Sequence, residues 1–163
     1  MSKKISVIIK KKIKKFNSSI TFTGDKSLTH RGFLIASQCK GISRLKAVLE
    51  SEDIKSTIKC LKELGVKIIK KNNQYLVFGN GLNSFMSPKT KRLDAGNSGT
   101  LVRILMGLLA THPNIRVKIN GDNSLNKRDM ERIINPLSKI GSIFVPKNKK
   151  NLPLVIQGTS MPL

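Results

Sequence analysis

The amino-acid sequence predicts an α/β fold made of two copies of one helix–strand–helix–strand–strand unit. Two observations support this: a glycine motif before a helix-like apolar stretch occurs twice, 72 residues apart, and an amphipathic helix that ends at a glycine also occurs twice. Hydrophobic residues make up 39% of the 163 residues and aromatic residues only 4%, so we expect an aliphatic core. We place the units at residues 24–79 and 96–158 and treat residues 80–95 as the link.

The first helix of each unit follows a glycine and a small polar residue. Residues 24–31 and residues 96–103 both open in this way and reach an arginine seven positions later. Each segment then runs into an apolar stretch that predicts a buried helix. At the same spacing, residues 44–48 and 116–120 match one another and predict the first strand of each unit.

The second helix of each unit begins near an aspartate and ends before a glycine. Asp53 and Asp129 are each followed by apolar residues at steps of 8 and 11, which lie on one stripe of a helix. Gly65 and Gly141 follow at a step of 12, where a helix C-cap favours positive φ. We expect both aspartates in the first helical turn and favour capping as their role.

A pair of strands closes each unit. Residues 66–71 and 75–78 flank a turn at residues 72–74, and residues 142–145 and 154–157 flank a loop rich in lysine and asparagine. We expect the helices of the two units to be buried on a shared sheet face.

The formal net charge of +22 comes mainly from lysines spread along the chain. Such a charge could displace counterions from nucleic-acid phosphates, or it could attract anionic substrates to an enzyme. It could also reflect a lysine-biased composition on a solvated surface, and we favour this interpretation for most of the lysines. The arginines are more informative, because a guanidinium binds phosphate and carboxylate through two parallel hydrogen bonds.

Membrane, secretion and metal signals are weak in this sequence. No apolar run approaches the ~18 residues of a membrane span, and no signal-peptide stretch follows the N-terminal lysines, so we expect a cytoplasmic protein without membrane contact. Cys39 and Cys60, 21 positions apart, are expected to be buried reduced thiols. We expect no metal site, and we treat the isolated His30 and His112 as structural.

Each glycine motif stands just before a predicted helix. A helix N-terminus offers unpaired N–H groups and a partial positive charge, which suit phosphate or carboxylate. In the first motif Lys26, Ser27 and Arg31 could converge on one phosphate.

Two further glycine-containing turns could also bind an anionic group. The second motif offers the amide of Asn97, close backbone approach at Gly99 and the hydroxyl of Thr100. A third segment at residues 121–128 ends in Lys127 and Arg128, which could clamp a carboxylate. Each turn alone could be a capped helix start, but three in one repeated scaffold favour a small polyanionic ligand. No Walker A pattern is present, which argues against a P-loop nucleotide site.

At these three segments the sequence resembles the EPSP synthase (3-phosphoshikimate 1-carboxyvinyltransferase) family. Residues 24–31 look like the GDKS-[IL]-[ST]-x-R signature, residues 96–103 like GN[AS]GTxxR, and residues 121–128 like GDxSLxxRPM. The motifs occur in the family's order, and the resemblance extends along nearly the whole chain.

The resemblance implies two small anionic substrates, shikimate 3-phosphate and phosphoenolpyruvate, with no cofactor, no metal, no nucleic-acid partner and a monomeric full protein. The residues that would bind shikimate 3-phosphate are Lys26, Ser27 and Arg31, and those that would bind phosphoenolpyruvate are Lys26, Asn97, Gly99 and Arg128. Lys26 would be the catalytic residue of this chain, while Thr100 and Arg103 would support the second loop.

The family reaction is an addition followed by an elimination. The 5-hydroxyl of shikimate 3-phosphate attacks C2 of phosphoenolpyruvate as C3 gains a proton, and loss of phosphate then leaves the enolpyruvyl ether. This chemistry needs acid and base groups and cations that stabilise the departing phosphate. The family's acid/base carboxylates and later basic ligands would lie beyond Leu163, so we expect no turnover by this chain alone.

The resemblance also implies the enolpyruvyl transferase fold, an inside-out α/β barrel with two domains of three units each. Residues 1–23 would belong to the other domain, and residues 24–163 would form an incomplete domain with two of its three units. Thr23 and Asp129 stand where many members carry proline, and we discount both differences, since Asp also suits a first helical turn.

Two alternatives remain for the function. The related enolpyruvyl transferase acting on UDP-N-acetylglucosamine would share the fold, but the run at residues 24–31 does not fit that family. A basic nucleic-acid-binding domain would explain the charge, but the sequence has no RNA-binding aromatic motif, no zinc finger and only one tyrosine.

Overall fold

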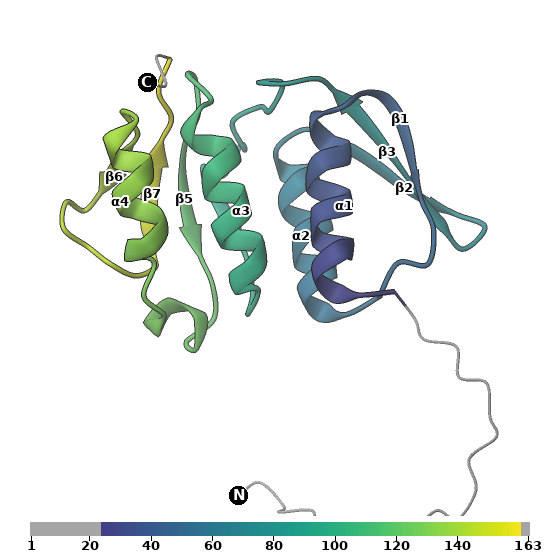
Figure 1. Cartoon of the computed structure of the whole chain (residues 1–163), viewed down its shortest axis with the longest axis horizontal. Coiled ribbons are helices and arrows are strands. Elements are labelled where there is room, and N and C mark those ends of the chain that lie inside the picture. Colours follow the sequence, from purple (N-terminus) through teal and green to yellow (C-terminus); the bar gives the residue numbers. More distant parts are fainter. Residues whose placement is uncertain (1–23, 161–163) are drawn as a thin grey trace, which may run out of the picture.

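Two β-sheets flank a group of helices in the computed structural model, which describes residues 24–160 (Figure 1). The helices α1, α2 and α3 lie between the sheets, and α4 covers the second sheet. The expectation for residues 1–23 falls outside the described residues.

The first unit has the predicted element order, but its first strand lies earlier than the predicted residues 44–48. Its elements are α1 (Lys26–Gln38), β1 (Lys40–Leu45), α2 (Glu52–Glu63), β2 (Lys67–Lys71) and β3 (Gln74–Asn80). The strands form an antiparallel sheet in the order β1-β3-β2.

The hairpin between β2 and β3 is tighter than the sequence suggested. Asn72 and Asn73 have φ values of 47° and 59°, which is the geometry of a two-residue type I′ turn. Gln74, which we had assigned to the turn, already pairs with Lys71 as the first residue of β3.

The second unit repeats the first. Its elements are α3 (Gly99–Ala110), β5 (Arg116–Asn120), the short 3₁₀ helix η1 (Leu125–Lys127), α4 (Glu131–Lys139), β6 (Ile143–Val145) and β7 (Leu154–Gln157). Its strands follow the order β5-β7-β6, which corresponds to β1-β3-β2 of the first unit. The duplication predicted from the sequence is confirmed.

Two expectations about the sheets were wrong. The link contains a strand, β4 (Arg92–Asp94), which pairs in parallel with β5 through Leu93 and Ile119 among others. A three-residue strand is too short to show a period in the sequence. Each unit also has its own sheet rather than a shared one, and the units meet through their helices, including α1 and α3.

One continuous apolar core runs through both units. Phe33 and Leu61 contribute from the first unit, Leu105 and Ile119 from the second, and all are fully buried or nearly so. The one aromatic pair between helix and sheet is edge-to-face, with 5.2 Å between the ring centroids of Phe33 and Tyr75 in the described part of the chain. The core is aliphatic, as predicted.

Glycines end the second helix of each unit. Gly65 and Gly141 have φ values of +89° and +98°, a region that side chains with a Cβ rarely adopt. After α2, the Gly65 N–H donates to the Lys62 carbonyl at 3.0 Å and the Val66 N–H to the Leu61 carbonyl at 2.9 Å. The predicted C-caps are therefore confirmed.

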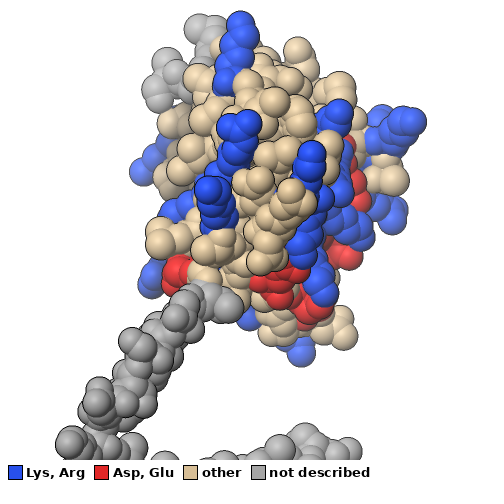
Figure 2. Space-filling view, turned by 90° about the vertical axis from the view of Figure 1, so that its right-hand side faces the viewer, with Lys and Arg blue, Asp and Glu red and all other residues tan. Residues whose placement is uncertain are grey.

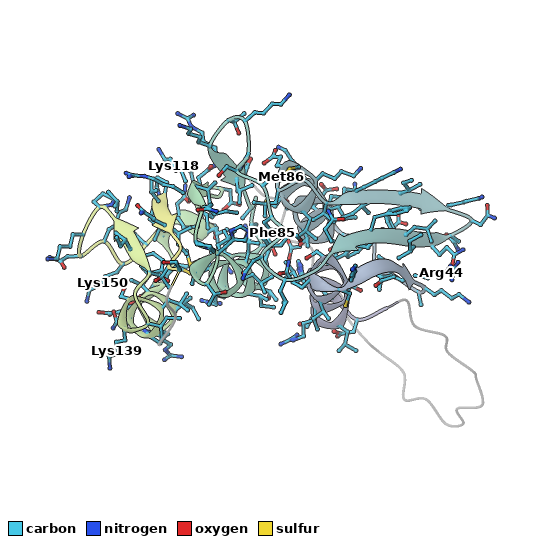
Figure 3. The ribbon with its side chains drawn as sticks, turned by 90° about the horizontal axis from the view of Figure 1, so that it is seen from above. Arg44, Phe85, Met86, Lys118, Lys139 and Lys150 are labelled. Atoms are coloured by element: carbon cyan, nitrogen blue, oxygen red, sulfur yellow. The ribbon has the colours of Figure 1, made fainter. Side chains whose placement is uncertain are left out.

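The link packs between the two halves of the molecule, where Phe85 and Met86 lie in Figure 3. The Phe85 ring stacks on His112 with 6.3 Å between centroids and an angle of 11°. The Met86 N–H donates to the Leu64 carbonyl at 2.9 Å. The link is thus part of the packed structure rather than a loose connection.

Basic side chains are spread over the outer face of the first sheet, with uncharged residues between them (Figure 2). Lys67 covers the ring of Phe78 at 4.9 Å, so part of its stem is used in packing. Within residues 24–160, no helix is long and apolar enough to cross a membrane.

The two cysteines differ, which corrects one expectation. Cys60 is buried and its thiol donates to the Asp94 carbonyl at 3.3 Å, and burial raises its pKa to about 12. Cys39 is exposed, because it is the C-cap of α1 and lies just outside the buried helical pattern. Among the described residues, no group of three His, Cys, Asp or Glu side chains could hold a metal ion.

Candidate anion-binding site

The first glycine motif forms the start of α1. The Asp25 carboxylate accepts a hydrogen bond from the Leu28 N–H at 2.7 Å and so caps the helix. A Cβ at Gly24 would lie 1.8 Å from the carbonyl oxygen of Ala47, so only glycine fits there. These two residues place Lys26 as the first residue of the helix.

The predicted shikimate 3-phosphate residues lie in the first two turns of α1. The Arg31 guanidinium donates to the Ser27 carbonyl at 3.1 Å, which holds it beside Ser27. The Lys26 ammonium lies 3.0 Å from the Asp53 carboxylate, and the two side chains are 51% and 25% exposed. Asp53 is in the first turn of α2, as predicted, but the expected capping role was wrong, because its carboxylate pairs with Lys26 instead of accepting a backbone N–H.

The second glycine motif is positioned by two parallel strands. Because β4 and β5 are parallel, the loops after both strands meet at one sheet edge. The Asp122 N–H donates to the Gly96 carbonyl at 2.8 Å and joins these loops. Gly96 has a φ of +56°, and a Cβ there would lie 2.8 Å from the Ser56 hydroxyl of α2.

The second and third motifs also meet through their side chains. The Asn97 amide nitrogen donates to Asp122 at 2.7 Å, and the Arg128 guanidinium donates to the Asn97 amide oxygen at 2.8 Å. The other Asp122 oxygen accepts from the Leu125 N–H at 2.7 Å. Asn97 is therefore held at both ends of its amide, in contact with Arg128 as the predicted phosphoenolpyruvate site requires.

Gly99 lies buried under two guanidinium groups. A Cβ at this position would lie 3.1 Å from Nη1 of Arg128 and 3.6 Å from Nη1 of Arg103. A cavity of about 630 Å³ opens beside them. Its lining residues are Arg103, Arg128, Asp129, Glu131, Arg132 and Asn135. Thr100, partly buried, follows Gly99 in the first turn of α3.

The electrostatics of both helix starts favour anions. Neither α1 nor α3 carries an acidic residue in its first turn, but the N-cap Asp25 offsets part of the positive dipole end of α1, whereas the N-cap of α3 is the neutral Ser98. Lys26 and Arg31 add charge at α1, and Arg128 adds charge at α3. Lys127, the other predicted clamp residue, lies exposed in η1.

Buried polar contacts connect the two helix starts. The fully buried His30 places Nδ1 2.7 Å from the Thr57 hydroxyl and Nε2 3.3 Å from the hydroxyl of Ser98, the N-cap of α3. Burial lowers the pKa of His30, while Asp53 raises it to a smaller extent. The contact between His30 and Ser98 therefore joins the first motif directly to the second.

Asp129 departs slightly from its predicted place. Helix α4 begins at Glu131, so Asp129 precedes the first turn instead of lying in it. Its carboxylate accepts from the Glu131 N–H at 2.6 Å, which confirms the capping role.

Sequence reasoning did not predict the contacts of four polar residues of this region, although it expected Asp53 to be a cap and His30 to be structural. Asp53, Asp122, His30 and Ser98 hold the candidate ligand residues in place. Ser98 and Asp122 lie within the second and third motifs, which were the available signal for them. The others depend on contacts between segments that are distant in sequence.

Known proteins resemble this chain along most of its length. The sequence profile of the family described as EPSP synthase (3-phosphoshikimate 1-carboxyvinyltransferase) matches residues 10–162. The 3-phosphoshikimate 1-carboxyvinyltransferase of Alkaliphilus metalliredigens is 40% identical over 156 residues, which are 95% of this chain and 36% of that protein. The Oenococcus oeni protein of the same name is 40% identical over 148 residues, or 91% of this chain and 33% of that protein.

A solved structure gives the same result. EPSP synthase from Acinetobacter baumannii matches with a TM-score of 0.78 and 34% identity, over 85% of this chain and 31% of that one. The chain thus spans about a third of the length of the relatives it matches. Together with the three motifs and the duplicated unit, these matches show that the chain belongs to the EPSP synthase family.

Proposed function

We propose that the complete protein containing this chain transfers the enolpyruvyl group of phosphoenolpyruvate to the 5-hydroxyl of shikimate 3-phosphate and releases phosphate. The observation that carries the proposal is the pair of helix starts, α1 and α3, each with cations beside it, which are joined through the hydrogen bonds of His30. Two anionic groups on two neighbouring substrates would match two such sites. The protein would act in the cytoplasm as a monomer without a cofactor.

Within this proposal, α1 binds shikimate 3-phosphate. Ser27 and Arg31 hold the phosphate, and Lys26 lies between the two substrates. The ion pair of Lys26 with Asp53 keeps the ammonium near the helix start before a ligand arrives. Because this pair is partly exposed, a phosphate can replace the carboxylate at small energetic cost.

Phosphoenolpyruvate binds at the start of α3 in the same proposal. Arg128 and the Asn97 amide contact its anionic groups, and Gly99 lets the ligand approach the backbone. Thr100 and Arg103 support the loop. Cationic side chains at this point stabilise the negative charge on the departing phosphate. Residues 24–160 form two units of the proposed domain, and the acid and base groups of the reaction come from other parts of the complete protein.

Calorimetric titration with shikimate 3-phosphate tests this assignment. We expect Lys26→Ala and Arg31→Ala each to weaken binding to the complete enzyme by about tenfold or more, since each removes a charge-assisted hydrogen bond. Lys139→Ala is the matched control, because Lys139 is an exposed cation on α4, far from α1 (Figure 3). Unchanged affinity in both site variants would refute the proposed site, and tighter binding of UDP-N-acetylglucosamine would favour the related transferase.

A further inference from the structure

His30 connects three helices through a buried chain of hydrogen bonds. It belongs to α1, its Nδ1 contacts Thr57 of α2, and its Nε2 contacts Ser98 at the start of α3. His30 and Thr57 are fully buried and Ser98 is 1% exposed, so water cannot replace a missing partner there. Thr57 and Ser98 are 27 and 68 positions away from His30 in the sequence.

The proton positions in this chain follow from which groups can donate. In the arrangement in which the Thr57 hydroxyl donates to the Asp53 carbonyl, 3.2 Å away, its oxygen accepts from His30 Nδ1. Nδ1 therefore carries the proton and Nε2 has a free lone pair. The Ser98 hydroxyl donates to that lone pair, and its oxygen accepts from the Leu101 N–H at 3.3 Å.

We propose that His30, as a neutral imidazole with its proton on Nδ1, is a positioning residue that couples the helix start at Lys26 to the loop at Asn97–Gly99. His30 lies one helical turn after Lys26, and it orients the hydroxyl with which Ser98 caps α3. Asn97 and Gly99 flank Ser98 directly, so the orientation of that hydroxyl determines the start of the second anion site. The ligand roles of the two loops rest on the proposed function, but the hydrogen-bond chain does not.

A protonated His30 would break this arrangement. Both ring nitrogens would then donate, and the Ser98 hydroxyl would lose its acceptor in a buried position. The charged groups that act on His30 are Asp53 on α2 and Lys26 and Arg31 on α1. Burial lowers the pKa of His30 most, the two cations lower it further, and Asp53 opposes them. The neutral form is the one that these surroundings stabilise.

Nitrogen-15 NMR of the histidine rings in the full chain tests the tautomer directly. We expect the long-range proton–nitrogen spectrum of His30 to show a protonated Nδ1 and an unprotonated Nε2 at neutral pH. His112, the other histidine of the chain, provides the internal reference. A proton on Nε2, or a charged ring at neutral pH, would overturn the inference.

Two conservative variants test the positioning role. The carbonyl of His30→Gln reaches the place of Nε2 and can accept from Ser98, whereas the shorter His30→Asn reaches only the place of Nδ1. We expect both to lower overall stability alike, but only His30→Asn to reduce hydrogen-exchange protection of the Leu101 amide relative to the rest of α3, by about fivefold. Equal Leu101 protection in the two variants would contradict the role.

Titration of the same variants of the complete protein with shikimate 3-phosphate separates this inference from the proposed function. We expect the ligand to shift the Asn97–Gly99 amides in the wild-type chain and in His30→Gln, but not in His30→Asn. Shifts of equal size in His30→Asn would show that the loops communicate without His30. If the ligand does not bind while the Nδ1–H tautomer and the Leu101 result hold, the positioning role stands and the proposed function loses its support.

Discussion

The two units share one scaffold but supply charge to their helix starts in different ways. At an offset of 72, Asp25 corresponds to Asn97 and Lys26 to Ser98. In the first unit Asp25 caps α1, and Lys26 brings the cation within the motif itself. In the second unit the cap moves one residue along, to Ser98, and the loop before α3 is neutral.

The cation of the second unit comes from a different loop. Because Ser98 caps α3, the Asn97 side chain is available to contact Arg128 and Asp122 of the third motif. Strand β4 makes this possible by aligning the second motif with the end of β5. The corresponding positions of the first unit, residues 20–22, lie outside the described residues.

The two units therefore share the helix start, but they differ in where the cation beside it comes from. Both units present main-chain N–H groups at a glycine-containing turn. A site with its cation in the motif depends on one loop, whereas a site with a cation from elsewhere depends on contacts between loops. The second unit should therefore be more sensitive to changes in the side chains that join its loops.

The largest effect is expected at Asp122. Asp122→Ala removes the acceptor for both the Leu125 N–H and the Asn97 amide. We expect a loss of about 1–2 kcal/mol in the free energy of unfolding and a clear loss of phosphoenolpyruvate affinity, because Asn97 is then held only by Arg128. Urea denaturation and calorimetry measure the two quantities.

Two variants place Asp122→Ala in context. Asp25→Ala removes only the cap of α1 in the first unit, so we expect the free energy of unfolding to fall by about 1 kcal/mol. Asn123→Ala changes the exposed neighbour of Asp122 and should have little effect. If Asp25→Ala weakened phosphoenolpyruvate binding as much as Asp122→Ala, the proposed contrast between the units would be wrong.

The next effect is expected at Gly99. The Cβ of Gly99→Ala would lie 3.1 Å from Nη1 of Arg128, so the guanidinium that also donates to Asn97 must move by about a few tenths of an ångström. We expect phosphoenolpyruvate affinity to fall by about tenfold while shikimate 3-phosphate affinity changes little, because a charge-assisted contact is disturbed at one site only.

Gly107→Ala is the matched control for this change. Gly107 is also within α3, and a Cβ there meets no atom within 4 Å. Alanine is the better helix former by up to about 1 kcal/mol, so this variant should be as stable as wild type or more stable. If Gly107→Ala also lost phosphoenolpyruvate affinity, the loss in Gly99→Ala would come from a change in the helix rather than from the contact between the new Cβ and Arg128.

Local sequence signals predicted most of the fold. The C-cap glycines Gly65 and Gly141, the Asn72–Asn73 turn and the apolar stripes of the helices act within a few residues, so their patterns can be read without knowing the tertiary structure. Because the unit is duplicated, most of these patterns occur twice in the sequence.

Contacts between distant segments could not be predicted in this way. Strand β4 exists because Leu93 is buried beside Ile119, and three residues carry too little pattern to reveal it. His30 was read as structural, and its partners lie in α2 and at the start of α3. Cys39 is the C-cap of α1, one residue beyond the end of the apolar helix, and it is exposed. The motifs located the candidate ligand residues, while tertiary packing determined what holds them.

The smallest effect is expected at Asp53, the partner of Lys26 in the first unit. The two side chains are 25% and 51% exposed, so solvent screens their attraction and Asp53→Asn should cost less than about 1 kcal/mol of stability. Because the carboxylate competes with a phosphate for the Lys26 ammonium, shikimate 3-phosphate should bind about two- to threefold more tightly to this variant. Glu52→Gln is the control, since Glu52 pairs with Lys55 instead. Calorimetry should show that Asp53→Asn binds shikimate 3-phosphate more tightly than wild type at low salt but not at high salt. Weaker binding by Asp53→Asn would mean that the carboxylate orients Lys26 for the ligand rather than competing with it.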